Sequence, residues 1–272
     1  MDDEVCRAPG GRSPHSSLDP KWLKAGVSED GQWSETKIGT PQGAVASPLL
    51  ANIYLHYVFD LWVEAWRKKV ATGTVVVVRY ADDLVLGFEN RADADRFLAE
   101  FRERLAKFGL ELHADKTRLI EFGRNAARNR QRRGEGKPET FTFLGFTHFC
   151  GRLTTGPFSV WRITAKKRMV AKLKAITAEL QLRKHHRTIE VGAWLRKVVL
   201  GYYQYHAVPG NTTQLRIFMC RVHWLWRGVL IRRSQRAKVK WDRLNRILYR
   251  WIPVPRVLHP YPDSRFTATH PR

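Results

Sequence analysis

The sequence predicts an α+β domain, in which a small antiparallel sheet packs with helices, followed by an all-helical domain. Apolar residues at helical spacing alternate with short β-branched runs up to residue 155, whereas the remainder is almost wholly helical in pattern. Charge divides the chain in a similar way: residues 1–123 hold 16 Lys+Arg and 19 Asp+Glu, and residues 124–272 hold 32 and 6. We expect a disordered start over 1–20, an α+β domain over 21–155 and a helical domain with a proline-rich tail over 156–272.

In the first domain, apolar residues spaced three and four apart predict a helix over Pro48–Trp66, with Ser47 as a candidate N-cap. Two β-branched and apolar runs within Thr74–Phe88 predict strands around a short acidic turn. Ala92–Phe108 is predicted to be a helix that stops at Gly109. Further strands are expected at Leu110–Leu112 and Thr117–Phe122.

The second half begins with a basic, Asn- and Gly-rich stretch, Gly123–Glu139, which we predict to be an exposed loop. A short strand is expected within Phe141–Phe149, and a domain boundary near 155–163. The helices predicted beyond it cover 165–186, 188–206, 211–235 and 238–250.

The formal net charge of +23 indicates a polyanionic partner, with nucleic acid as the first candidate and a membrane surface as the second. The sequence has no apolar run of the ~18–20 residues that a membrane span needs. Its 3 cysteines are far apart and favour a reducing compartment over a disulfide framework. An acidic start without an apolar stretch argues against a secretory signal. We expect a cytoplasmic protein with no membrane partner.

Asp82 and Asp83 are adjacent carboxylates at the predicted hairpin turn, where like charges repel unless a cation is shared. Hard oxygen ligands of this kind suit Mg²⁺. Because neighbours in a strand point to opposite faces, at most one of them is expected to be a principal ligand. The alternative is an Asp-Asp pair that only favours chain reversal. His185-His186 has no partner at metal-ligand spacing, so no zinc site is expected.

Four motifs occur in a familiar order: Thr40-Pro41-Gln42-Gly43, Tyr80-Ala81-Asp82-Asp83, the run Gly109–Thr117, and Phe143-Leu144-Gly145-Phe146. With the segment Trp22–Asp60 and the tail His259–Phe266, they resemble the bacterial group II intron reverse transcriptase/maturases over roughly residues 20–272. This resemblance implies a polymerase palm followed by a helical thumb, or maturase, domain. It also implies a mobile element whose protein takes part in RNA splicing and stays with RNA in the bacterial cytoplasm or nucleoid.

The resemblance implies RNA-directed DNA synthesis, with Asp82 and secondarily Asp83 holding two Mg²⁺ ions and Lys116 as general acid to pyrophosphate. An ordinary solvated lysine is the alternative for Lys116. Pro41, Gln42, Gly43 and Tyr80 would contact the incoming nucleotide and the template–primer, although a turn and a buried tyrosine would explain them as well. Phe143, Leu144, Gly145 and Phe146 would form the primer grip, for which core packing is the competing explanation.

The helical half would bind group II intron RNA and the RNA template/DNA primer. Basic groups neutralise phosphates, and the aromatic side chains interleaved with them can stack on unpaired bases. Taken singly, each of these residues is better explained by a solvated face, or in the case of tryptophan by the core, and only the set as a whole indicates nucleic-acid binding. The candidate RNA-binding residues are Lys166, Lys167, Arg168, Arg196, Lys197, Arg227, Arg232 and Arg233.

The sequence departs from the family pattern at its start. Family members have a fingers region and a palm strand with another metal-binding aspartate before Trp22, and Asp2, Asp3 and Asp19 do not lie in a strand-like setting. We therefore expect an incomplete two-metal site and impaired nucleotidyl transfer from dNTPs. The alternatives are a non-catalytic RNA-binding or splicing-helper module, and a fragment that associates with itself or with a chain supplying the missing palm strand.

Overall fold

A computed structural model describes residues 27–29, 32–34, 47–152, 156–233 and 241–261 of the chain. Its contacts divide the chain into two compact units, Met1–Leu119 and Ile120–Arg272. The predicted boundary near 155–163 falls inside the second unit, so the proposed extents of palm and thumb remain predictions.

A two-stranded hairpin near the start of the first unit joins β1 (Val27–Glu29) to β2 (Gln32–Ser34) in antiparallel register, with Val27 opposite Ser34. The predicted nucleotide-contacting residues Pro41, Gln42 and Gly43 lie outside the described residues.

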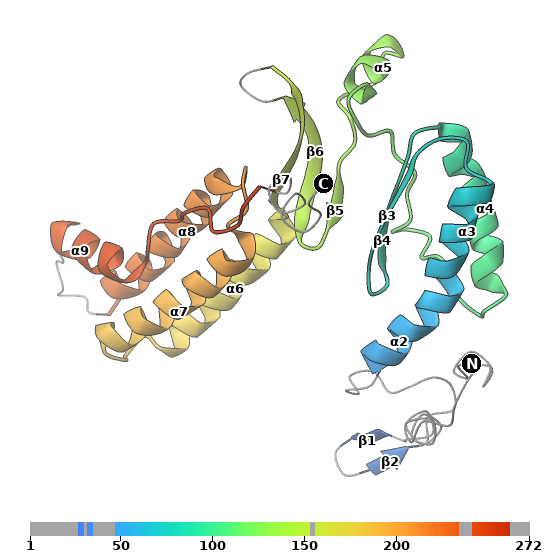
Figure 1. Cartoon of the computed structure of the whole chain (residues 1–272). Coiled ribbons are helices and arrows are strands. Elements are labelled where there is room, and N and C mark those ends of the chain that lie inside the picture. Colours follow the sequence, from blue (N-terminus) through green and yellow to red (C-terminus); the bar gives the residue numbers. More distant parts are fainter. Residues whose placement is uncertain (1–26, 30–31, 35–46, 153–155, 234–240, 262–272) are drawn as a thin grey trace. The chain divides into compact units, whose positions relative to one another are not determined.

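The predicted helix over Pro48–Trp66 is confirmed as a continuous helical rod (Figure 1). It consists of α2 (Ser47–Leu55), a π-helical segment (His56–Asp60) and α3 (Leu61–Lys69). The helix begins at Ser47 itself, one residue earlier than expected. Periodicity did not predict the π-helical segment, a form that recurs at functional sites.

The predicted hairpin is confirmed: β3 (Val75–Tyr80) pairs antiparallel with β4 (Asp83–Phe88). The helix α4 (Arg91–Ala106) follows and ends before Gly109, whose φ of 66° provides the left-handed cap. Buried aromatics join these elements, with ring centroids 5.1 Å apart for Phe59–Phe101 and 5.0 Å for Trp66–Phe97. The helical rod, the hairpin and α4 thus share one core.

A buried carboxylate, Asp93, closes the loop between α3 and β3. Its Oδ2 accepts hydrogen bonds from Thr72 N (2.9 Å), Thr72 Oγ1 (2.9 Å) and Gly73 N (3.0 Å), and Oδ1 accepts one from Arg96 (2.8 Å). Burial by itself would raise the pKa of Asp93, but these bonds outweigh it and lower the pKa to about 2. The carboxylate therefore stays ionised and fixes the start of the hairpin.

Two predicted strands are wrong. Leu110–Leu112 and Thr117–Phe122 form no strand in the structure. Leu110 and Leu112 instead pack against the core of the first unit, so their apolar character reflects burial and not sheet pairing. The predicted loop Gly123–Glu139 also needs correction, because it contains a short helix, α5 (Ala126–Arg132).

The second unit contains a three-stranded antiparallel sheet with the order β5-β6-β7. The single strand expected within Phe141–Phe149 is in fact a hairpin of β5 (Phe141–Phe143) and β6 (Phe146–Arg152). The third strand, β7 (Phe158–Thr164), lies where the sequence suggested a domain boundary. A buried amide, Asn211, accepts from Thr164 N (2.9 Å) and donates to His206 O (2.8 Å), which links β7 to the following helices.

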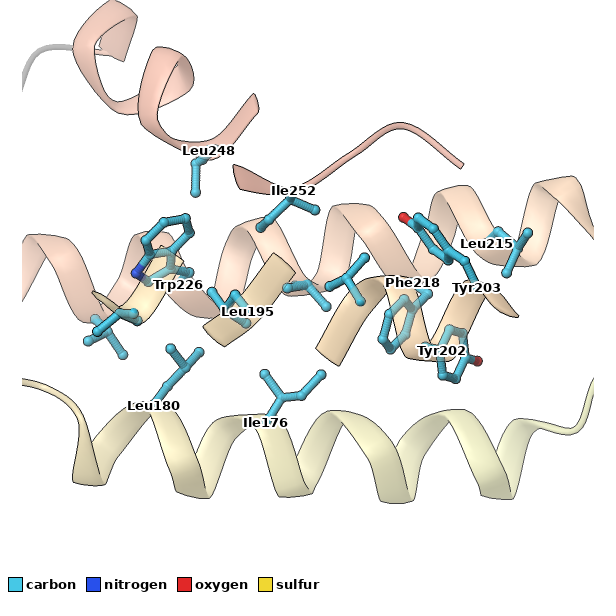
Figure 2. Packing of buried hydrophobic residues seen from close by; sticks show 14 of the residues in the cluster. Ile176, Leu180, Leu195, Tyr202, Tyr203, Leu215, Phe218, Trp226, Leu248 and Ile252 are labelled. Carbon is cyan, nitrogen blue, oxygen red and sulfur yellow. The ribbon is translucent and has the colours of Figure 1, made fainter. Parts of the chain in front are cut away.

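The predicted helices of the basic half are confirmed as α6 (Lys166–Leu182), α7 (Thr188–His206), α8 (Thr212–Ile231) and α9 (Trp241–Trp251). Figure 2 shows how they enclose a core that includes Ile176, Leu195 and Trp226. None of the helices described is long and apolar enough to cross a membrane. The predicted α+β class with a helical region is confirmed.

Candidate functional site

The β3–β4 hairpin turns through two residues, Ala81 and Asp82, with Tyr80 directly opposite Asp83. Ala81 has a φ of 52°, in the left-handed region that costs a residue with a Cβ about 1 kcal/mol or more. Such strain is concentrated at functional sites, where surrounding contacts keep it in place. The hairpin tip is therefore a strained turn that presents carboxylates.

Asp82 and Asp83 are both exposed at this tip, and they occupy different positions. Asp83 is the first residue of β4 and shares a sheet face with Tyr80, whose side chain is 63% exposed. Asp82 lies in the turn itself. The structure thus brings Asp82, Asp83 and Tyr80 together, although whether they contact metal and substrate remains a prediction.

An arginine clamp, which sequence reasoning missed, fixes this tip to the helical rod. Arg79 donates from Nε to Asp60 Oδ1 (2.8 Å) and from Nη2 to Asp60 Oδ2 (2.7 Å), a bidentate ion pair. Its Nη1 donates to Asn52 Oδ1 (2.8 Å) and to the carbonyl of Ala81 (3.2 Å). One guanidinium therefore joins α2, the π-helical segment and the strained turn.

The side chains of Arg79 and Asp60 are only 17% and 31% exposed, so water screens the pair weakly. Burial alone would raise the pKa of Asp60, but the hydrogen bonds and positive charge of Arg79, with His56 nearby, lower it below the ordinary value. In the sequence, the one sign of this clamp was an arginine within an otherwise apolar predicted strand. Its partners, Asn52 and Asp60, could not be identified without the fold.

Arg79→Ala is expected to destabilise the first unit by about 2 kcal/mol, because the half-buried Asp60 loses its bidentate guanidinium partner and keeps only the exposed His56. It should also raise hydrogen–deuterium exchange over residues 75–88, since the turn loses its anchor. Urea unfolding and exchange mass spectrometry measure the two effects. The matched control is Arg67→Ala, which removes an exposed ion pair with Glu64 and should cost at most about 0.5 kcal/mol. Equal losses in the two variants would contradict the clamp.

Asp82 and Asp83 offer the hard carboxylate oxygens that Mg²⁺ prefers, and their exposure leaves them accessible to an ion. Across the parts of the chain that the structure describes, however, no group of three or more His, Cys, Asp or Glu side chains is placed to hold a metal. The two aspartates therefore fit as part of a ligand set, and the described residues do not complete it.

Lys116 is exposed in a turn of the first unit, where its backbone N–H donates to His113 O (3.2 Å). No hydrogen bond or ion pair seen in the described ranges joins its side chain to Asp82 or Asp83. The general-acid role implied by resemblance thus gains no geometric support and remains a prediction.

The predicted primer-grip residues form the tight turn between β5 and β6, with φ of 47° at Leu144 and 77° at Gly145. The second unit holds this turn closely. Tyr205 donates its hydroxyl to Leu144 O (2.8 Å), and Ala165 N donates to Gly145 O (2.9 Å). Phe146 stacks on Tyr205 at 5.7 Å. The motif is therefore a rigid hairpin tip packed on α6 and α7.

Of the candidate RNA-binding residues, most are exposed: Lys166, Lys167 and Arg168 in the first turn of α6, Arg196 and Lys197 on α7, and Arg232 after α8. Cations at a helix N-terminus oppose the helix dipole, so those on α6 do not serve helix stability. Arg233 instead donates to Thr188 Oγ1 (3.0 Å) and His186 O (2.6 Å), which secures the start of α7.

Arg227 lies between two aromatic rings, with its guanidinium carbon 4.9 Å from the Trp224 ring centroid and 3.8 Å from that of Trp241. Both tryptophans are more than half exposed. The arrangement offers flat rings and a positive charge together, the combination that stacks on unpaired bases. The sequence showed these residue types, but the contact between α8 and the start of α9 comes from the tertiary structure.

Comparison with known proteins agrees with the motifs. The sequence model of the family described as reverse transcriptase (RNA-dependent DNA polymerase) matches residues 13–148. The chain is 61% identical over 41 residues to the group II intron-encoded protein LtrA of Lactococcus lactis subsp. cremoris, which covers 15% of this chain and 7% of LtrA. It is 31% identical over 151 residues to the protein YkfC of Escherichia coli K12, covering 42% of this chain and 39% of YkfC. The matches thus span well under two thirds of these relatives.

Proposed function

Because the chain belongs to the reverse transcriptase (RNA-dependent DNA polymerase) family, we propose that it is the palm and RNA-binding part of a group II intron reverse transcriptase/maturase. Its chemistry is Mg²⁺-dependent nucleotidyl transfer from dNTPs onto a DNA primer. One observation carries the proposal: a strained, clamped turn presents Asp82 and Asp83 at the tip of an antiparallel hairpin. The aspartates occur inside the segment that matches the family.

The proposed roles follow the positions of these side chains. Asp82, in the turn, and Asp83, at the start of β4, hold Mg²⁺ through carboxylate oxygens. When bound, the two ions would activate the primer 3′-hydroxyl and stabilise the leaving pyrophosphate. Tyr80 borders the primer end, since it shares a sheet face with Asp83. Arg79 positions the turn and does not contact substrate.

We propose further that this chain alone catalyses slowly. A two-metal site requires carboxylates beyond one adjacent pair, and the described residues provide no third ligand beside Asp82 and Asp83. The exposed cations of α6 and α7, with Arg227 between its two tryptophans, bind the phosphates and bases of intron RNA and template–primer. RNA affinity should therefore survive where catalysis is weak.

Two exposed apolar surfaces favour an alternative in which the chain works with a further polypeptide strand, from a second copy or another chain. On the outer face of β3, Val76 is 57% exposed, and Val78 and Tyr80 are exposed with it. Along the helical rod, Leu49, Ile53, Tyr57 and Leu61 form another exposed apolar stripe. Apolar faces of this kind are typical of association surfaces.

Primer extension on poly(rA)/oligo(dT) with dTTP and Mg²⁺, with RNA filter binding in parallel, tests the proposal. We expect template-dependent extension at a rate below about 1 s⁻¹, the low end for enzymes, together with RNA binding that weakens as salt rises. Extension at a full polymerase rate would refute the incomplete site. RNA binding without any extension would favour the splicing-helper module, and the absence of both would refute the proposal itself.

A further inference from the structure

The segment from Glu121 to Glu139 forms a small basic knob around α5. The RNA-binding role proposed for the helices α6–α9 does not account for this knob. It includes five arginines within residues 124–133. In Figure 1, α5 lies at the end of the β5–β6–β7 sheet away from α6–α9. The knob therefore presents positive charge at a separate place in the second unit.

Two of the arginines, Arg130 and Arg133, hold the knob together through ion pairs within the segment. Arg133 forms ion pairs with Glu121 and with Glu135, the latter at 2.6 Å. Arg130 pairs with Glu135 (3.3 Å) and Glu139 (3.6 Å). Hydrogen bonds from Arg133 hold the pKa of the Glu121 and Glu135 carboxyls below their ordinary values. These contacts close the chain around the short helix.

The knob is also attached to the sheet. Phe122 meets Phe141 of β5 edge to face, with ring centroids 5.1 Å apart. The backbone N–H of Gly123 donates to Cys150 Sγ of β6 at 3.2 Å. Ala126, the first residue of α5, is buried. A short helix that is unstable alone is thereby held in a defined position.

The other three arginines, Arg124, Arg128 and Arg132, are exposed, and their side chains form no ion pair or hydrogen bond with any residue described in the structure. They are spaced four residues apart. Arg128 and Arg132 therefore share a face of α5, about 6 Å apart along its axis, and Arg124 precedes them just before the helix. Like charges at this spacing repel, so the row does not stabilise the helix.

We propose that this row, Arg124, Arg128 and Arg132, is a docking site for the phosphate backbone of RNA, separate from the thumb helices. The proposal rests on the proposed function, which makes nucleic acid the polyanionic partner. α5 contains no large apolar side chain, and an interfacial membrane helix needs a face of them. It has no aromatic ring for base stacking either, so the contact reads phosphates and not sequence.

The test uses the full chain with R124A, R128A and R132A combined. The matched control combines K69A, R102A and K107A, which removes three exposed cations of the first unit that make no described ion pair. Binding of a structured RNA is measured over a series of KCl concentrations. Each phosphate contact contributes about 0.7–0.9 to the slope of log K against log salt. We expect the test variant to lose about 2–3 units of slope and about tenfold in affinity, and the control to change little.

A triple arginine-to-lysine variant should retain most of the affinity, because a point charge still contacts phosphate. Unchanged slope and affinity in the alanine variant, with wild-type binding intact, would overturn this inference alone. The inference would also be overturned if the alanine variant lost binding to phosphatidylserine vesicles but kept its RNA affinity. Failure of the wild-type chain to bind RNA would instead refute the proposed function. The unfolding temperature should stay constant in the variant, because the three side chains bond to nothing that could be lost.

Discussion

Asp82→Ala is expected to lower the rate of Mg²⁺-dependent primer extension by roughly a thousandfold, the scale lost when a site loses a stabiliser of transition-state charge. The fold should be unaffected, because the Asp82 side chain is exposed in the turn and forms no hydrogen bond or ion pair with the residues that the structure describes. Single-turnover extension on poly(rA)/oligo(dT) measures the rate, and circular dichroism checks the fold.

The matched control is Asp95→Ala, which removes another exposed carboxylate of the same unit, on α4. It should leave the extension rate within a factor of about two, because Asp95 only forms an exposed pair with Arg91. RNA affinity should be the same in both variants. A normal rate in Asp82→Ala would show that this aspartate is not a metal ligand of the polymerase.

Trp226→Ala is expected to destabilise the second unit by about 3–5 kcal/mol, as is usual when a buried tryptophan is truncated in a packed core. Trp226 is 0% exposed and lies within the core of α6, α7, α8 and α9 (Figure 2). Its indole N–H has no hydrogen-bond partner among the described residues, so the loss comes from packing alone. Urea unfolding followed by tryptophan fluorescence measures the change.

Trp224 is the matched control, two residues earlier on the same helix and 64% exposed. Trp224→Ala should cost at most about 1 kcal/mol, from its contact with Arg227. It should instead weaken binding of single-stranded RNA, where a stacked base contributes about 1–3 kcal/mol. Similar destabilisation by both variants would contradict the assignment of one tryptophan to the core and the other to the surface.

Elements with strong periodicity were predicted well. The rod over Pro48–Trp66, the β3–β4 hairpin and the four later helices follow from apolar spacing, because each buries one face in a local core. The wrong predictions concern short apolar runs, because residues that are buried in a core and residues that pair in a sheet are both apolar. Leu110 and Leu112 are apolar because they pack, yet no strand lies beside them. The sequence did not predict β7, because the apolar residues at positions 158, 160, 161 and 163 do not alternate strictly with polar ones.

The candidate site divides in the same way. Adjacent aspartates at a turn predict a metal-binding motif without a fold, because like charges in one place repel unless a cation is shared. The arginine clamp could not be recognised from the sequence. Arg79, Asp60 and Asn52 are up to 27 residues apart, and only the packing of the hairpin on the π-helical segment brings them together.

The amino-acid sequence by itself determined the family, the carboxylate pair and the separation of a mildly acidic part from a strongly basic one. These are properties of residue type and order, which need no contact to be read. Only the tertiary structure decided which of two competing apolar stripes on α8 is buried: Leu215, Phe218, Val222 and Trp226 face the core, and Ile217 and Trp224 are exposed. Both stripes have helical spacing, and the neighbouring helices can cover only one of them. The same reason holds at α5, where residue type alone does not distinguish the five arginines. Their neighbours do: Arg130 and Arg133 form ion pairs within the knob, and the other three side chains remain available to RNA.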